Sequence, residues 1–485
     1  MPAESEPNDT TDVKLQAVPI GARWVTTQET MEVRSPYDDR LVGRVPACGA
    51  AEVDAAVSAA RDRLAEPLPP HERAAILGRA AAVLDAQQED FARCIAEEAA
   101  KPLRTARIEA ARAVDTFRFS AAEARTLAGD MVPLDASTAG EGKLGFTLRV
   151  PVGVVGAITP FNFPLNLVAH KVAPGIAAGC PLVLKPASQT PLTALLLARA
   201  LIEECGLPAG WLNVVTGGGR AVGDPLVSHA DVAMITFTGS PEVGWGIRER
   251  AARKKVNLEL GNNSPVIIEP DGDWRAAAAK IRTAGFSHAG QSCISTQRIY
   301  VHESIADDFV ATLVEAVSTL VVGPPLEEAT EVSALISRGD TERVGAWIAD
   351  AVAEGAKVAY GGDVGSDGVL RPTVLTDVSP EMKVCREEVF GPVVAVASYG
   401  TLDEALDLAN DSDYGLQAGI FTSRLDTALS AARRLDYGGV LVNEVPTWRA
   451  DQQPYGGVRN SGNTREGPHY AVREMTEERF VVLGP

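Results

Sequence analysis

The chain has 485 residues, too many for a single hydrophobic core of ordinary size, so two or three domains are expected. Hydrophobic residues make up 46% of the chain and charged residues 22%, a composition typical of a globular protein with a large buried core. A formal net charge of −19 argues against nucleic acid or an anionic membrane as a partner, because both attract clustered Lys and Arg.

The N-terminal residues and the cysteines indicate in which cellular compartment the protein is expected. Residues 1–12 are polar and acidic, which predicts a disordered tail and not a signal peptide. No apolar run approaches the ~20 residues of a membrane span, so no membrane association is expected. The cysteines lack the dense spacing of disulfide frameworks or zinc sites, which predicts a reduced, cytoplasmic protein without a metal. They are Cys48, Cys94, Cys180, Cys205, Cys293 and Cys385.

Helical spacing of Ala and Leu predicts helices over 53–65 and 71–99, and a further long helix is expected over 108–128. Residues 141–155 are richer in β-branched and aromatic residues and are expected to include a strand. Strands and helices then alternate, which predicts a doubly wound α/β fold. The strands are expected over 152–158, 181–185, 212–215 and 234–237, and the helices over 165–178, 191–204, 221–228 and 241–253.

The alternation begins again after Pro265. A second start of this kind predicts a second α/β domain, which would carry Cys293. Its first elements are expected as strands over 266–268 and 299–301 and helices over 274–289 and 305–320.

Cys293, in the segment Gly290-Gln291-Ser292-Cys293, is the candidate nucleophile. A thiol between small residues can attack a carbonyl carbon, and nearby N–H groups or a cation favour its thiolate. A lone cysteine is more often buried and structural, which is the interpretation for Cys48, Cys94 and Cys205. For Cys293 the motifs described next favour catalysis.

Two further segments carry candidate catalytic groups. Glu259, in Leu258-Glu259-Leu260-Gly261, has apolar neighbours that predict a raised pKa, which suits a general base near neutral pH. The alternative is a Glu that caps the turn at Gly261. Asn162, in Pro160-Phe161-Asn162-Phe163-Pro164, is the candidate oxyanion donor together with the backbone N–H of Cys293. The alternative is a turn-forming Asn.

With Lys185-Pro186-Ala187-Ser188 and Glu387-Glu388-Val389-Phe390-Gly391-Pro392, these segments resemble the aldehyde dehydrogenase superfamily in order and approximate spacing, from about Gln28 to the C-terminus. The resemblance implies two doubly wound α/β domains plus a small β oligomerisation extension. It also implies a homodimer or homotetramer. The implied divisions are a dinucleotide-binding domain over 13–126 and 150–260, a catalytic domain over 261–460, and an oligomerisation element over 127–149 and 461–485.

The resemblance implies NAD or NADP as cofactor. It places Lys185 on the adenosine ribose, Glu388 on the nicotinamide ribose and Phe390 beside the nicotinamide ring. Gly239 and Ser240 stand between a strand and a helix, where backbone N–H groups can bind pyrophosphate. Ser188 stands where strict NAD users carry an acidic residue, so the choice between NAD and NADP stays open. The resemblance also assigns cofactor contacts to Thr159, Phe161 and Leu260.

The implied reaction is oxidation of a small polar or anionic aldehyde to its carboxylic acid through a cysteine thiohemiacetal and thioester. The presence of Glu259 favours hydrolysis over transfer to coenzyme A, since acylating relatives lack this residue. A cofactor-independent thiol esterase and a non-catalytic protein are the alternatives from other classes.

Four arginines are candidates for binding the substrate. Arg104, Arg107 and Arg112 lie on or beside one predicted helix, and Arg449 lies near the C-terminal motif. Of these, Arg107 and Arg449 are the residues predicted to bind the aldehyde. The run from Pro454 to Pro468 resembles lactaldehyde, succinate-semialdehyde and phosphonate-aldehyde dehydrogenases. Ser292 departs from the Arg that phosphonate-binding members often carry there.

Overall fold

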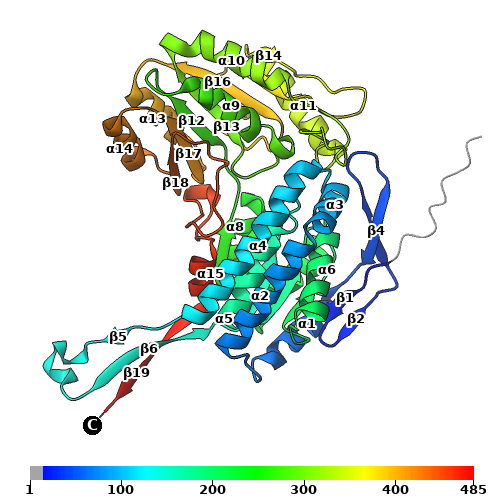
Figure 1. The fold of residues 1–485 in the computed structure, drawn as a ribbon, viewed down its shortest axis with the longest axis vertical. Coiled ribbons are helices and arrows are strands. Elements are labelled where there is room, and N and C mark those ends of the chain that lie inside the picture. Colours follow the sequence, from blue (N-terminus) through cyan, green and yellow to red (C-terminus); the bar gives the residue numbers. More distant parts are fainter. Residues whose placement is uncertain (1–14, 485) are drawn as a thin grey trace, which may run out of the picture.

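Two parallel sheets and a β arm organise the protein in the computed structural model, which describes residues 15–484 (Figure 1). The predicted tail over 1–12 lies outside the described residues. The two sheets confirm the predicted pair of doubly wound α/β units. Two short hairpins precede them: β1 (Val18–Ile20) with β2 (Arg23–Val25), and β3 (Thr30–Arg34) with β4 (Leu41–Pro46).

The first sheet has five parallel strands in the order β11-β10-β7-β8-β9. The chain runs outward from β7 through β8 and β9, then returns to place β10 on the other side of β7. The strand order therefore reverses between β7 and β10, and ligands of open α/β sheets bind at the carboxyl ends of such strands. The strands are β7 (Val154–Ile158), β8 (Leu182–Lys185), β9 (Leu212–Val214), β10 (Val232–Thr238) and β11 (Lys255–Glu259).

Helices cover both faces of this sheet. They are α1 (Ala50–Arg63), α2 (Pro70–Ala86), α3 (Gln88–Ala99), α4 (Leu103–Thr126), α5 (Asn166–Ala178), α6 (Leu192–Arg199), α7 (Asp224–Ser228), α8 (Pro241–Arg250) and, from the C-terminal end of the chain, α15 (Pro468–Glu474). The single helix predicted over 71–99 is two helices, because Gln87 leaves the helical region with φ −108° and ψ 20°. The helix predicted over 191–204 is α-helical only to Arg199 and ends in a π-helical turn.

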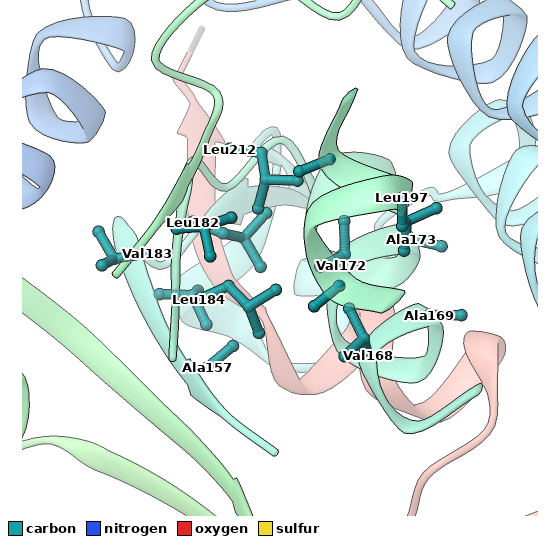
Figure 2. Close-up of a cluster of buried hydrophobic side chains, with 14 of the residues drawn as sticks. Ala157, Val168, Ala169, Val172, Ala173, Leu182, Val183, Leu184, Leu197 and Leu212 are labelled. Carbon is teal, nitrogen blue, oxygen red and sulfur yellow. The ribbon is translucent and has the colours of Figure 1, made fainter. Parts of the chain in front are cut away.

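α5 is buried along its whole length and packs against α2, α4 and α15. Its Val168 and Val172 lie in one apolar cluster with Leu182 and Leu184 of β8 (Figure 2). A Cβ at Gly175 would lie 2.7 Å from Leu182, so this glycine lets helix and sheet approach closely. The polar residues of α5 are buried as well, and they belong to the site described below.

The second sheet has seven strands in the order β14-β15-β16-β13-β12-β17-β18, parallel except for the β14–β15 pair. The helix predicted over 274–289 ends at Ala284, and Phe286 then leaves the helical region with φ −127°. Positive φ at His288, Ala289 and Gly290 turns the chain toward Cys293. The strands are β12 (Ser264–Ile268), β13 (Thr296–His302), β14 (Lys357–Tyr360), β15 (Thr373–Thr376), β16 (Val393–Tyr399), β17 (Gln417–Phe421) and β18 (Gly439–Val442). The helices are α9 (Trp274–Ala284), α10 (Ala306–Ser318), α11 (Arg338–Ala353), α12 (Lys383–Arg386), α13 (Leu402–Asn410) and α14 (Leu425–Arg434).

The arm extends away from both units and carries the C-terminal end of the described chain (Figure 1). It consists of β5 (Met131–Val132), β6 (Leu144–Pro151) and β19 (Thr476–Leu483), paired antiparallel in the order β19-β6-β5. Its strands leave large apolar side chains exposed, including Met131, Leu144, Leu148, Phe480 and Val482. Across residues 15–484, no helix is both long enough and apolar enough to span a membrane.

Candidate active site

The loop after β7 and the turn before β13 meet at Asn162. Asn162 is buried, and its Nδ2 donates a hydrogen bond to the backbone oxygen of Gln291 at 2.9 Å. This bond joins the first sheet to the segment of Cys293, 131 residues away in sequence. The second N–H of the same amide has no protein acceptor in the described structure and can serve an oxyanion.

A buried ion pair fixes this loop from behind. Lys101 Nζ lies 2.5 Å from Glu109 Oε2, and both side chains are inaccessible. The other oxygen of Glu109 accepts the backbone N–H groups of Leu165 and Asn166 at 2.9 and 3.0 Å. The Lys101 ammonium also lies 3.7 Å from the ring centroid of Phe163. The Asn162 loop is therefore held by charge-assisted bonds.

The turn before Cys293 is tightly packed. A Cβ at Gly290, whose φ is +70°, would lie 2.0 Å from the backbone oxygen of Gly391, so only glycine fits there. Cys293 is partly buried, with its Sγ 2.8 Å from the hydroxyl of Tyr455. Burial raises the pKa of Cys293 to about 12, although the Tyr455 hydrogen bond and the charge of Arg449 oppose the increase.

Glu259 ends β11 and is 3% exposed. Neither of its carboxyl oxygens has a hydrogen-bond partner among the described residues. Burial, followed by the nearby negative charge of Glu466, raises the pKa of Glu259 well above its ordinary value. A Cβ at Gly456 would lie 2.7 Å from Glu259 Oε1, so the carboxyl group packs against the residue next to Tyr455. The sequence prediction of a desolvated Glu is confirmed.

A network of buried charges surrounds these groups. Glu466 accepts from Lys171 at 3.0 Å and from Arg449 at 3.3 Å. Burial alone would raise the pKa of Glu466, but Lys171, Arg449 and His170 lower it to about 2. The Arg449 guanidinium also lies 3.7 Å from the ring centroid of Tyr455 and 3.2 Å from His170 Nε2.

Asp451 connects this network to α4 and α5. Its carboxylate accepts two bonds from Arg112 at 2.8 and 3.1 Å, one from Asn166 at 3.0 Å, and lies 3.0 Å from His170 Nε2. Burial opposes ionisation of Asp451, but His170 and Arg112 outweigh it and lower its pKa. Burial, followed by the charge of Arg449, lowers the pKa of His170.

A cavity of about 350 Å³ opens at the point where the strand order reverses. Cys293 and Asn162 share it with most of the predicted cofactor residues: Phe161, Gly239, Ser240, Leu260, Glu388 and Phe390. Thr159, Lys185 and Ser188 lie outside this lining, at the carboxyl ends of β7 and β8.

Groups in the cavity and beside it, at the carboxyl ends of β7 and β8, can hold a dinucleotide. Lys185 is 7% exposed, and no carboxylate of residues 15–484 pairs with it. Its Nζ donates one hydrogen bond, to the Pro186 oxygen at 3.1 Å. Burial lowers the pKa of Lys185 to about 8. Ser240 is the N-cap residue of α8 and makes no side-chain cap hydrogen bond, which leaves backbone N–H groups of the first turn for a phosphate. The rings of Phe161 and Phe390 meet edge to face at 5.8 Å.

A second cavity of about 500 Å³ lies between α4 and the catalytic unit. Ser292 and Ile294, the neighbours of Cys293, line it together with Arg112, Phe163 and Trp448. Arg107 does not line it. Instead Arg107 points to the far side of α4 and pairs with Glu89 and Glu328, both at 2.7 Å. The structure therefore does not support Arg107 as a substrate residue.

The chain matches known proteins over nearly its whole length. Residues 24–481 match the family described as "Aldehyde dehydrogenase family". The chain belongs to this family. A 3-sulfolactaldehyde dehydrogenase of Priestia aryabhattai is 48% identical over 98% of this chain and 99% of the relative.

Two solved structures also align closely with this chain. Aldehyde dehydrogenase 21 from Physcomitrella patens, in complex with the reaction product succinate, is 38% identical with a TM-score of 0.94 over 98% of this chain and 99% of the other. An NADP-dependent glyceraldehyde-3-phosphate dehydrogenase from Bacillus halodurans, complexed with NADP, is 36% identical with a TM-score of 0.94 over 97% and 99%.

This aldehyde dehydrogenase is an oxidoreductase whose cofactor is NAD or NADP. Sequence reasoning missed the role of Tyr455 against Cys293 and the network of Lys171, His170 and Glu466. Lys171 and Glu466 are separated by 295 residues, and nothing in either local segment indicates the pair. The one available signal was the set of three polar residues in the otherwise apolar helix α5.

Proposed function

We propose that this aldehyde dehydrogenase oxidises a short polar or anionic aldehyde at Cys293, with Asn162 as oxyanion donor and Glu259 as general base. The convergence of the three groups carries the proposal. Asn162 is bonded to the residue two positions before Cys293, and Glu259 packs beside the tyrosine that contacts the Cys293 sulfur.

In this mechanism the Cys293 thiolate adds to the carbonyl carbon, and the carbonyl oxygen takes the electron pair. The Asn162 amide and the Cys293 backbone N–H stabilise that oxyanion. When bound, NAD or NADP supplies the hydride acceptor. Loss of hydride from the thiohemiacetal leaves a thioester on Cys293. Glu259 then takes a proton from water as the water oxygen attacks the thioester, and the carboxylic acid departs from the regenerated thiolate.

The position of Glu259 supports hydrolysis over the alternatives. A carboxyl group without partners, with a raised pKa, can accept a proton from water close to the thioester. Transfer to coenzyme A would not need this base. A cofactor-independent esterase would not need Lys185, Glu388 and the exposed N-terminus of α8.

The substrate proposal rests on the α4 cavity. It adjoins the nucleophile through Ser292 and Ile294 and has the Arg112 guanidinium in its wall. The relatives compared above are named for 3-sulfolactaldehyde and glyceraldehyde 3-phosphate, or hold succinate, and all three molecules are short and anionic. We therefore infer a three- or four-carbon aldehyde with an anionic end. Arg112 and Lys280 are the cations in the wall of this cavity. Arg449, which lies against the Tyr455 ring, stays a proposed substrate residue.

Matched substrate pairs test this proposal. The kcat/KM of glyceraldehyde 3-phosphate is compared with that of glyceraldehyde, and succinate semialdehyde with butanal. We expect the anionic member of at least one pair to be favoured about tenfold or more, which corresponds to ~1.4 kcal/mol. Arg112→Lys should keep this preference and Arg112→Gln should lose it. Arg107→Gln, on the other side of the same helix, is the matched control and should change nothing. Equal rates within every pair would contradict an anionic substrate.

The remaining assignments follow the same resemblance. We propose that residues 13–126 and 150–260 bind the dinucleotide, that 261–460 form the catalytic domain, and that 127–149 with 461–485 join copies into a homodimer or homotetramer. The exposed apolar side chains of β6 and β19 support assembly through the arm. Sedimentation analysis of Phe480→Glu, which should yield smaller species, tests this. Six unpaired cysteines support a reducing cytoplasmic location.

A further inference from the structure

The hydroxyl of Tyr455 is a hydrogen-bond partner of the reacting sulfur that the mechanism above does not use. Its Oη lies 2.8 Å from Cys293 Sγ, and the residue is 2% exposed. The backbone of Tyr455 is fixed by two hydrogen bonds with Glu466, at 3.1 and 2.5 Å. The phenol is therefore held in place, and a ring without the hydroxyl would fill the same space.

Arg449 lies against the face of this ring. Its guanidinium is 3.7 Å from the ring centroid, its side chain is 5% exposed, and Glu466 and His170 hold it from the other side. A cation over an aromatic face withdraws electron density from the ring. The hydroxyl of such a phenol is a stronger hydrogen-bond donor.

The hydrogen bond between Tyr455 and Cys293 has a different donor requirement once the sulfur has lost its proton. In the thiol form either atom can donate the hydrogen bond. A thiolate can only accept, so the Tyr455 proton then points to sulfur, and the bond gains strength because the acceptor is charged. An interaction that is stronger with the anion than with the thiol favours ionisation.

The hydrogen bond from Tyr455 matters because burial and the nearby carboxyl groups disfavour the Cys293 thiolate. Burial disfavours it, and the carboxyl groups of Glu388 and Glu259 face the sulfur as well. Arg449 and Tyr455 are the groups that favour the anion. Burial, followed by the neighbouring thiol, raises the pKa of Tyr455 well above its ordinary value, so the phenol keeps its own proton.

We propose that Tyr455 is a catalytic residue, whose hydroxyl donates a hydrogen bond to the Cys293 sulfur and stabilises the attacking thiolate, and that Arg449 strengthens this donor from behind the ring. The thiol proton passes to solvent water in the cavity that Cys293 lines, and Tyr455 is neither deprotonated nor consumed. This inference rests on the proposed role of Cys293 as the nucleophile.

The test is the pH dependence of Cys293 alkylation in wild type and in Tyr455→Phe. Iodoacetamide reacts with the thiolate, and mass spectrometry of the peptide that contains Cys293 separates this site from the other five thiols. We expect the apparent pKa of Cys293 to rise by about one unit in Tyr455→Phe, a roughly tenfold loss of thiolate near neutral pH. The kcat/KM for the aldehyde should fall by a similar factor, and the deficit should shrink as the pH rises.

Two further variants make the test specific. Tyr399→Phe removes a buried hydroxyl that donates to the Ile268 oxygen at 2.9 Å in the same domain, and it should leave Cys293 alkylation unchanged. Arg449→Met keeps the hydroxyl and removes the cation, so it should shift the profile in the same direction as Tyr455→Phe.

Each outcome decides a different claim. An alkylation profile that is the same in Tyr455→Phe and wild type overturns the proposal, even where kcat/KM falls, because the hydroxyl would then act only on structure. If Arg449→Met leaves the alkylation profile unchanged, the proposal that Arg449 strengthens the Tyr455 donor is overturned. Full aldehyde oxidation by Cys293→Ala would instead remove the nucleophile assignment itself, and with it the proposed function.

Discussion

Glu259→Gln separates the two halves of the proposed reaction. The substitution keeps the shape of a side chain that is 3% exposed and has no hydrogen-bond partner among the described residues. It removes only the ability to accept a proton from water. Because the carboxyl group has no hydrogen-bond or ion-pair partner among the described residues, its replacement breaks no interaction on which the fold depends. We expect a melting temperature close to that of the wild type.

The size of the effect follows from the chemistry of the lost step. A positioned general base contributes about 10²–10⁴ in rate, or ~2.7–5.4 kcal/mol of barrier. Addition of the thiolate and loss of hydride do not use Glu259, so the first turnover should survive. The variant should therefore show a burst of reduced nicotinamide, with an amplitude close to the concentration of active sites, and then a steady rate lowered by that factor.

Stopped-flow absorbance of the reduced cofactor measures both phases in a single trace. Glu98→Gln is the matched control, because Glu98 is another fully buried carboxyl group in the same unit, where it accepts the N–H groups of Leu192 and Thr193. It should leave the burst and the steady rate in their wild-type ratio. A wild-type steady rate in Glu259→Gln would refute the reasoning, since another group would then activate the water.

Three further predictions concern the nucleophile and the cofactor. Cys293→Ala should lower turnover more than about a hundredfold, or ~2.7 kcal/mol, with an unchanged Kd for NAD by calorimetry; more residual activity would contradict its role. Ser188→Glu should lower the NADP-to-NAD ratio of kcat/KM by about 10- to 100-fold through like-charge repulsion, and an unchanged ratio would show that Ser188 does not face the ribose. Burial raises the pKa of Glu388 to about 7, and its ionised form is the better acceptor for ribose hydroxyls. The Kd for NAD should therefore fall as the pH rises through about 7 and be flat in Glu388→Gln; a flat wild-type profile would contradict this.

Local motifs made part of the site predictable. The segments of Asn162, Glu259 and Cys293 each carry their chemistry within a few residues, and the structure brings all three together. Local motifs did not predict the surroundings of Arg107. Arg107 and Arg112 lie five residues apart on α4, a rotation of roughly 140° about the helix axis, so they face different surroundings. The sequence indicated the helix, but only packing shows that Arg112 faces the cavity and Arg107 faces Glu89 and Glu328.

The two buried carboxyl groups beside the nucleophile show why the network is harder to predict than the motif. Apolar neighbours were sufficient to predict a raised pKa for Glu259, since burial is its largest cause. Glu466 is just as buried, yet Lys171 and Arg449 both pair with it and hold it ionised. Its negative charge then raises the pKa of Glu259 further. Opposite shifts in neighbouring carboxyl groups assign them different chemical roles. Here Glu466 pairs with both Lys171 and Arg449, and Glu259 has no partner among the described residues and can accept a proton.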